Sequence, residues 1–309
     1  MEFSEKKIKE TLKDYLKNQE YLVIEEFDVG GIRPDLAAFK WKNKYEIENI
    51  AIEAKDSTST AKIKEALSQL MNYQIYFSQV YLAVPLPKDQ KKEQIINMMK
   101  LFNIGVYFVD NEGRIILGNM PKRDNIRINL KKHTPFVRQR GVAALIFREL
   151  IPNAEMHYTS DEKDFYIWSG KDINYEIFFE EFLWESHIAF GLTIQGGRGL
   201  SKVKKIKENT FLKYIQMLTE YYITFYKYAS PYRQGSVYLE TVMHKKIEDI
   251  SEKDLKFMFK LIRERDGYNI LISKPVWKLT EILSREEHKI RVRAVKKELD
   301  GAYNYLTSL

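Results

Sequence analysis

The stretch RPDLAAFKWKNKYEIENIAIEAK, residues 33–55, decides how the first part of this chain folds. Two runs rich in strand-forming residues, Arg33 to Phe39 and Tyr45 to Lys55, flank a polar turn at residues 43–44. The runs are close enough in sequence to pair as neighbouring strands. Side chains at positions i and i+2 of a strand face the same side, so the pattern predicts that Glu53 and Lys55 point together.

Periodic patterns on both sides of this stretch predict the other elements of the same sheet. In chain order they are a helix after an N-cap at Ser4, a strand over Tyr21 to Phe27, a helix over Ala61 to Phe77, a strand over Val80 to Val84, a helix over Gln90 to Phe102, and strands over Gly105 to Val109 and Arg114 to Leu117. The early strands are close in sequence and predict a meander, whereas intervening helices predict parallel crossovers for the later ones. We therefore expect an α/β fold with a mixed sheet flanked by helices.

Two carboxylates and a lysine come together if the strands of residues 33–55 pair. Asp35, near the start of the first strand, can then sit beside Glu53 at the end of the second. Carboxylates a few ångströms apart repel unless a cation bridges them, and hard oxygen ligands select Mg²⁺ or Mn²⁺ over zinc. Asp35 and Glu53 are therefore the predicted metal ligands. Lys55, beside that metal, can hold or help deprotonate a water that attacks a phosphate, and can stabilise the charge that develops.

The following helix offers two further candidates, Gln69 and Tyr73. They are spaced i, i+4, so they share one face of the helix. That face can look onto the strand ends, where the two side chains would position water or phosphate.

These residues, taken with their element order of helix, three strands, helix and strand, resemble the PD-(D/E)xK nuclease superfamily. The Gln-x-x-x-Tyr element resembles the RecB-type and related exonuclease-like branches in particular. The resemblance covers residues 1–122 and implies a restriction-endonuclease-like fold with Mg²⁺-dependent phosphodiester hydrolysis. It implies that Asp35 and Glu53 bind the metal, that Lys55 is the catalytic lysine, and that Gln69 and Tyr73 support them.

The resemblance adds a candidate on the first helix, where many members of the superfamily carry a glutamate. Glu5 shares a helix face with the apolar residues Ile8 and Leu12, and Glu10 is its competitor. In one respect the chain departs from part of the family. RecB-type nucleases with an iron–sulfur cluster need cysteines, and this chain has none.

Charge is divided unevenly along the 309 residues, which contain 50 Lys+Arg and 43 Asp+Glu for a formal net charge of +7. Residues 1–120 hold 17 basic and 18 acidic residues, so the whole excess lies in the remainder. The change coincides with a turn signal at Gly118 to Pro121. We therefore predict a nuclease-like domain over residues 1–122 and a basic domain over residues 123–309.

The sequence of residues 123–309 predicts an α+β domain. We recognise no family for this part of the chain. A helix over Gly141 to Leu150 is followed by antiparallel strands between Met156 and Ile194, and then by long helices over Lys202 to Tyr228, Glu252 to Arg265 and Ser284 to Leu306. Three basic clusters can track a phosphate backbone: Lys202, Lys204, Lys205 and Lys207; Arg138, Arg140 and Arg148; and Arg285, Lys289, Arg291, Arg293, Lys296 and Lys297. We expect this domain to bind nucleic acid or to regulate the first.

Composition excludes several classes of protein. The absence of cysteine excludes disulfides, thiolate-bound zinc and a cysteine nucleophile. No run reaches the roughly 18 apolar residues of a spanning helix, and no signal peptide precedes the first helix, so we expect a cytoplasmic protein without membrane contact.

The sequence therefore predicts a metal-dependent nuclease acting on DNA, with RNA left open and an endonuclease of restriction, defence or repair as the natural setting. Homodimerisation is plausible if both strands are cut, because each chain has one such site. Two alternatives stay open. The first part can be a non-cleaving nucleic-acid-binding relic or a subunit of a complex, or the second domain can sense a small ligand or a partner protein.

Overall fold

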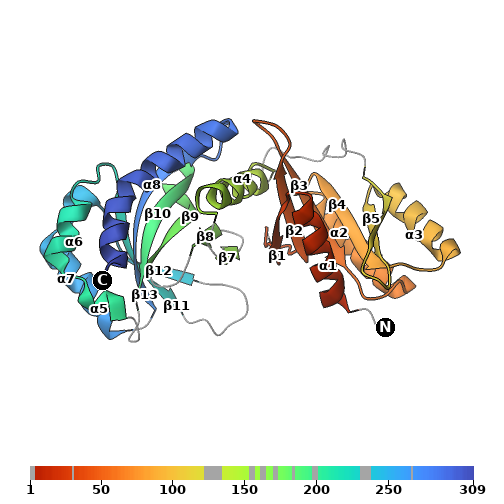
Figure 1. The fold of residues 1–309 in the computed structure, drawn as a ribbon, viewed down its shortest axis with the longest axis horizontal. Helices are drawn as coiled ribbons and strands as arrows, with labels where there is room; N and C mark the ends of the chain where they lie inside the picture. Colours follow the sequence, from red (N-terminus) through yellow and green to blue (C-terminus); the bar gives the residue numbers. More distant parts are fainter. Residues whose placement is uncertain are drawn as a thin grey trace. The chain divides into compact units, whose positions relative to one another are not determined.

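The structure, a computed structural model, describes residues 4–29, 31–121, 134–152, 157–160, 165–169, 173–182, 185–196, 201–229, 238–265 and 267–309. The chain divides into two compact units, Met1–Leu145 and Ile146–Leu309. The domain boundary predicted at residue 122 falls at the edge of residues 122–133, which lie outside the described part, and stays a prediction. Figure 1 shows the elements of both units.

The first unit contains a six-stranded sheet in the order β1-β2-β3-β4-β5-β6. Its elements are α1 (Glu5–Asn18), β1 (Leu22–Glu25), β2 (Leu36–Trp41), β3 (Ile47–Ala54), α2 (Thr60–Tyr73), β4 (Gln79–Pro85), α3 (Asp89–Leu101), β5 (Gly105–Val109) and β6 (Ile115–Asn119). Every helix and strand predicted for this part of the sequence is present.

The strand directions follow the predicted connections. β1, β2 and β3 pair antiparallel as a meander, β3, β4 and β5 pair parallel through the crossover helices α2 and α3, and β6 returns antiparallel to β5. The mixed sheet flanked by helices, and hence the α/β class of this unit, is confirmed.

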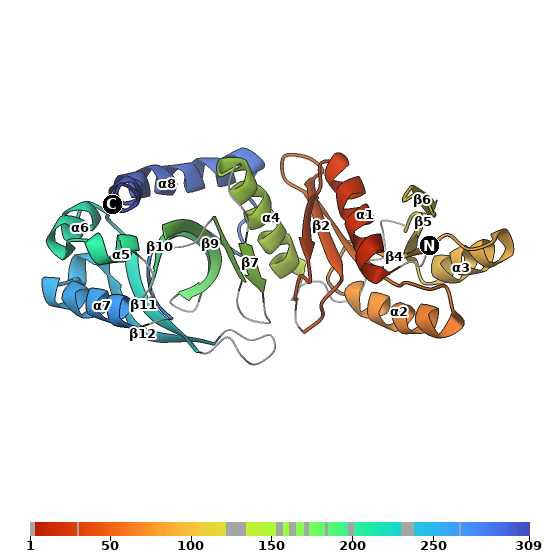
Figure 2. The same ribbon diagram turned by 60° about the horizontal axis from the view of Figure 1, so that its bottom comes forward.

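Helix α1 packs on one face of this sheet. It begins at the N-cap Ser4, whose side chain accepts a hydrogen bond from the Lys7 amide at 3.2 Å. Its apolar stripe Ile8, Leu12 and Leu16 is fully buried in a cluster with sheet residues. Helix α2 lies on the opposite face (Figure 2). The start of β2 and the end of β3 therefore lie between two helices.

The second unit contains a seven-stranded antiparallel sheet in the order β12-β11-β13-β10-β9-β8-β7. Its elements are the end of α4 (Thr134–Leu150), β7 (His157–Ser160), β8 (Phe165–Trp168), β9 (Ile173–Phe182), β10 (Glu185–Gln195), α5 (Ser201–Lys205), α6 (Glu208–Ile215), β11 (Tyr222–Ala229), β12 (Tyr238–Lys246), α7 (Glu252–Glu264), β13 (Tyr268–Lys278) and α8 (Arg285–Thr307), with a 3₁₀ turn at Ile247–Asp249. An antiparallel sheet with separate helices is the predicted α+β arrangement.

One element of this unit was predicted wrongly. The long helix expected over Lys202 to Tyr228 is two short helices, α5 and α6, followed by strand β11. The chain turns at Glu220, whose φ is 63°, and then enters a run rich in aromatic and β-branched residues. Such residues favour a strand, and pairing with β12 and β13 overrides the helical spacing. Strands β12 and β13 were also missed.

Among the described helices, none has both the length and the apolar character to cross a bilayer.

We expect Leu12→Ala to lower the free energy of unfolding by about 2–5 kcal/mol, because it leaves a cavity between α1 and the sheet. Glu10→Ala on the same helix is the control, because Glu10 is exposed and pairs only loosely with Lys6 at 3.9 Å. Its effect should stay within about 0.5 kcal/mol. Urea unfolding followed by circular dichroism measures both. Equal losses in the two variants would show that α1 does not depend on its buried stripe.

Candidate active site

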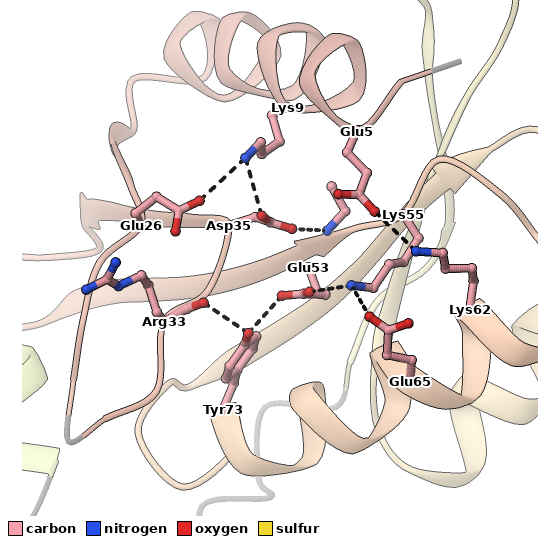
Figure 3. A network of polar contacts seen from close by, with 11 residues as sticks. Glu5, Lys9, Glu26, Arg33, Asp35, Glu53, Lys55, Lys62, Glu65 and Tyr73 are labelled. Carbon is pink, nitrogen blue, oxygen red and sulfur yellow. Dashed lines mark hydrogen bonds and ion pairs between the residues drawn. The ribbon is translucent and has the colours of Figure 1, made fainter. Parts of the chain in front are cut away.

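Asp35 and Glu53 lie opposite each other at one end of the first sheet. The terminal pair between β2 and β3 is Leu36 with Ile52, so one further step of the antiparallel register sets Asp35 against Glu53. Directly opposed residues of an antiparallel pair have Cβ atoms about 5 Å apart. The structure thus brings the two predicted metal ligands together (Figure 3).

The Asp35 carboxylate is fixed by backbone and by a lysine. Its Oδ2 accepts a hydrogen bond from the Ala54 amide at 2.8 Å, which satisfies an N–H group at the end of β3, beyond the first paired residue of β2. Its Oδ1 lies 3.4 Å from Nζ of Lys9 on α1, and the same Nζ lies 3.5 Å from Glu26. Asp35 is therefore held by the sheet edge on one side and by α1 on the other.

Glu53 is almost completely buried, at 4 % exposure, and both of its oxygens accept hydrogen bonds. Lys55 Nζ donates to Oε1 at 2.8 Å, and the Tyr73 hydroxyl donates to Oε2 at 2.7 Å. The same hydroxyl lies 3.2 Å from the carbonyl oxygen of Arg33. Lys55 is also buried, and its Nζ reaches Glu65 of α2 at 3.1 Å. The predicted catalytic lysine and the helix-borne tyrosine therefore meet on one carboxylate.

The pKa values reflect burial and crowding of charge. Burial raises the pKa of the Glu53 carboxyl, the charge of Asp35 raises it further, and the hydrogen bonds from Lys55 and Tyr73 only partly offset the rise. Burial lowers the pKa of Lys55, but Glu53 and Glu65 outweigh that effect, so its pKa is raised and its ammonium is charged at neutral pH. Burial, followed by the Glu53 charge, raises the pKa of the Tyr73 hydroxyl, which stays a donor.

Helix α2 presents a polar face of three residues to this site. Glu65, Gln69 and Tyr73 are spaced by four, and the first and last contact Lys55 and Glu53 respectively. Gln69 lies between them, and its Oε1 is buried without a hydrogen-bond partner among the described residues. The predicted pair Gln69 and Tyr73 does share one face, and the amide oxygen of Gln69 is available to a molecule that the chain does not supply.

Glu5 is the predicted residue with the weakest link to the site. It starts α1, one turn before Lys9, and its carboxylate lies 4.0 Å from Nζ of Lys62 on α2. It is at the same end of the sheet (Figure 3), but no hydrogen bond or ion pair among the described residues joins it to Asp35 or Glu53. The competitor Glu10 is exposed and pairs with Lys6, so it does not face the site.

Sequence reasoning missed Lys9 and Glu65, which contact the core of the site. The signal for Glu65 was its spacing, one turn before Gln69 on the same face of α2. The signal for Lys9 was its place four residues after Glu5 on α1. Neither spacing says which residue of another element will be opposite, so both contacts needed the tertiary structure.

Two of the predicted basic clusters are largely engaged within the protein. In the cluster of Arg138, Arg140 and Arg148, Arg140 is buried at 1 % exposure and donates to the Asp28 carbonyl at 3.0 Å. Arg138 donates to the Tyr45 carbonyl at 2.7 Å. In the cluster on α8, four residues pair with acidic side chains of their own unit: Arg285 and Lys289 with Glu149, Arg291 with Glu281, and Lys296 with Asp300. Lys204, Lys205 and Lys207 of the remaining cluster are exposed, whereas the side chain of Lys202 lies outside the described part.

The chain was compared with protein-family models and with curated proteins. No family model matches it, and no curated protein matches it either. What the site can do is therefore argued from its own chemistry.

The donor set suits a hard divalent cation. Among the described residues no group of three or more His, Cys, Asp or Glu side chains gathers to hold a metal, so the protein would supply Asp35 and Glu53. Mg²⁺ binds through one or two carboxylates and keeps several waters, so two are enough. Each of their oxygens accepts one hydrogen bond and retains a second lone pair. The residues fit Mg²⁺ or Mn²⁺ in type and number.

We expect two substitutions to move the pKa of Glu53 in opposite directions. Tyr73→Phe removes a hydrogen bond that stabilises the ionised carboxylate, so the pKa rises further. Asp35→Asn removes a neighbouring negative charge, so the pKa falls. Carboxyl ¹³C NMR titration of the metal-free protein measures both, with Tyr45→Phe in an exposed turn as the control. A Glu53 pKa that is unchanged in both variants would mean that the three side chains do not interact.

Proposed function

We propose that the first unit is a nuclease that hydrolyses phosphodiester bonds of DNA with Mg²⁺ or Mn²⁺ bound by Asp35 and Glu53. The observation that carries the proposal is the meeting of these two carboxylates with the buried Lys55 and with Tyr73 at the junction of β2, β3 and α2. Buried titratable side chains that contact one another and have raised pKa values, as Glu53 and Tyr73 do, are typical of a catalytic site. The mixed sheet flanked by helices supports a restriction-endonuclease-like fold.

Each residue has a defined task in this reaction. When bound, the metal supplies Lewis-acid activation of a phosphate oxygen and of a water. Asp35, anchored by the Ala54 amide, and Glu53, oriented by Tyr73, present their free lone pairs to it. Lys55 brings a charged ammonium beside Glu53, where it can donate to the attacking water or to a phosphate oxygen whose charge increases. The unpartnered Gln69 Oε1 can accept a hydrogen bond from that water and orient it.

DNA is the proposed substrate, and RNA stays an alternative because both nucleic acids present the same phosphodiester group to these residues. Lys204 and Lys207, together with Arg293 and Lys297 of α8, are exposed and are the candidates for phosphate contacts in the second unit. Cleavage of both strands of a duplex would need two copies of the chain, because each chain has one such site. A non-cleaving nucleic-acid-binding protein is the alternative that the experiment below distinguishes.

We expect the purified protein to cleave plasmid or single-stranded DNA with Mg²⁺ or Mn²⁺ and to stop when EDTA is added. Asp35→Asn and Lys55→Met should each lower the rate by about a hundredfold or more, because each removes a group that acts on the reacting phosphate. Gel assays of nicked, linear and shortened products measure the rate.

The matched controls are Glu10→Gln and Lys64→Met, which remove an exposed carboxylate on α1 and an exposed lysine on α2. Both should cleave at the wild-type rate. Activity that survives Asp35→Asn or EDTA contradicts the metal mechanism. Binding of DNA or RNA without cleavage of either would favour the non-cleaving alternative.

Lys9 should compete with the metal for Asp35. Lys9→Met removes a cation that lies 3.4 Å from Oδ1, so we expect Mn²⁺ to bind about two- to fivefold more tightly, the worth of a partly exposed ion pair. Lys13→Met is the control, because Lys13 is one turn along the same helix and pairs with Glu25. Electron paramagnetic resonance of free Mn²⁺ measures the affinity without any cleavage. Equal affinity in both variants would show that Lys9 does not occupy the metal's position.

A further inference from the structure

The ammonium of Lys55 lies between two carboxylates that come from different elements (Figure 3). Its Nζ donates to Glu53 Oε1 of β3 at 2.8 Å and to Glu65 Oε1 of α2 at 3.1 Å. The proposed function gives Glu53 a task, which is to bind the metal, and gives Glu65 none. We therefore ask what the second carboxylate adds to a lysine that already has a partner.

The backbones that carry Lys55 and Glu65 are both held by regular structure. Lys55 directly follows β3, and its amide donates to the Ala83 carbonyl of β4 at 2.9 Å. Glu65 lies in α2 next to Ala66, which is fully buried, and two turns before Tyr73, whose hydroxyl is bonded within the same site. The contact between the two side chains therefore joins a strand end and a helix whose positions are set by packing.

Solvent reaches the two partners unequally. The Lys55 side chain is 6 % exposed, whereas the Glu65 side chain is 52 % exposed. The hydrogen bond from Lys55 lowers the pKa of the Glu65 carboxyl, so this carboxylate is ionised at neutral pH. Glu65 is therefore a charged acceptor on the solvent side of a buried lysine.

An ammonium has three N–H donors, and two fixed acceptors determine where the third donor points. A single hydrogen bond to Glu53 leaves the ammonium free to rotate about the axis of that bond. The second bond, to Glu65, removes this freedom. Within the described part of the chain these two carboxylates are the partners of Lys55 Nζ, so one N–H remains for a molecule from outside.

The remaining N–H is the donor that the proposed reaction uses. Under that function the charge of Glu53 is shared with a divalent metal, which weakens the hold of this carboxylate on the ammonium. Glu65 is not one of the proposed metal ligands, so it keeps its full charge. The contact with Glu65 is then the one that holds the ammonium in place.

We propose that Glu65 is a positioning residue, which fixes Lys55 so that the third N–H of its ammonium points at the phosphate under attack. The inference rests on the proposed function, because only that reaction uses this donor. Glu65 acts through Lys55 and touches neither metal nor substrate. The two side chains thus form one unit, and without the lysine the glutamate has no effect on the rate.

The test measures DNA cleavage by the full chain with Glu65→Ala, with Lys55→Met and with both changes. Glu65→Ala should lower kcat about tenfold and change KM by less than about twofold, because a misdirected donor loses its effect in the transition state. In the Lys55→Met background it should lower the rate no further. Glu65→Gln keeps an acceptor oxygen and should recover part of the rate. Glu93→Ala, at an exposed glutamate of α3, is the control and should cleave normally.

Two further measurements do not depend on cleavage. Glu65→Ala should speed hydrogen exchange at Lys55 Nζ about two- to fivefold, the worth of a partly exposed ion pair, as ¹⁵N NMR of the metal-free protein records. Electron paramagnetic resonance of free Mn²⁺ should show an affinity within about twofold of the wild type in Glu65→Gln. A loss of about tenfold or more would make Glu65 a metal ligand and overturn the proposal.

The outcomes separate this inference from the function on which it rests. A wild-type protein that cleaves no nucleic acid contradicts both. Cleavage that is lost in Lys55→Met but kept in Glu65→Ala contradicts the positioning role alone. A loss in Glu65→Ala that recurs in full in the Lys55→Met background does so too, because Glu65 would then act without the lysine.

Discussion

The buried carboxyl of Glu53 constrains the whole first unit, because a group of this kind is tolerated in a sheet only when both oxygens are satisfied. One donor, Lys55, comes from the same strand two residues later, and the other, Tyr73, comes from the last turn of α2. Both requirements fix the distance between β3 and α2 and the rotation of that helix about its axis. Tyr73 can donate to Glu53 only if the apolar stripe of α2 packs on the sheet as it does.

The same constraint orders the charges around the site. Asp35 repels Glu53, and the repulsion is relieved by a lysine on each side, Lys9 for Asp35 and Lys55 for Glu53. The acidic residues Glu26 and Glu65 then balance the two lysines. The charges alternate, so the group can be partly buried without a large net field. Under the proposed function, a divalent ion between the carboxylates would compete with these two lysines for the same oxygens.

The sequence and the structure agree where the determinants are local. Spacing along the strands predicts that Glu53 and Lys55 share a side, and spacing along α2 predicts that Gln69 and Tyr73 share a face. Pairing of the two strands of residues 33–55 follows from their closeness in the chain. The meeting of Lys9 with Asp35, or of Glu65 with Lys55, depends on how helices dock, and no local pattern contains that information.

The second unit shows the opposite case. Strand β13 lies between β10 and β11 although it follows them by many residues, and such long-range pairing leaves little trace in local periodicity. A single long helix over residues 202–228 was therefore predicted wrongly, because the end of that segment, from Tyr222 onward, pairs as strand β11 with β12 and β13. Glu176 likewise looks like an ordinary polar residue of a strand until the register sets it opposite Gly191 in the interior of the sheet, where it is buried.

The contacts of the first site come from a short part of the chain, between Lys9 and Tyr73. During synthesis this part leaves the ribosome before the second unit does, and β4 follows it to cover the open edge of β3. Helix α1, the meander and α2 can therefore assemble while the second unit is still being made. The order of the chain thus separates in time the folding of the two units.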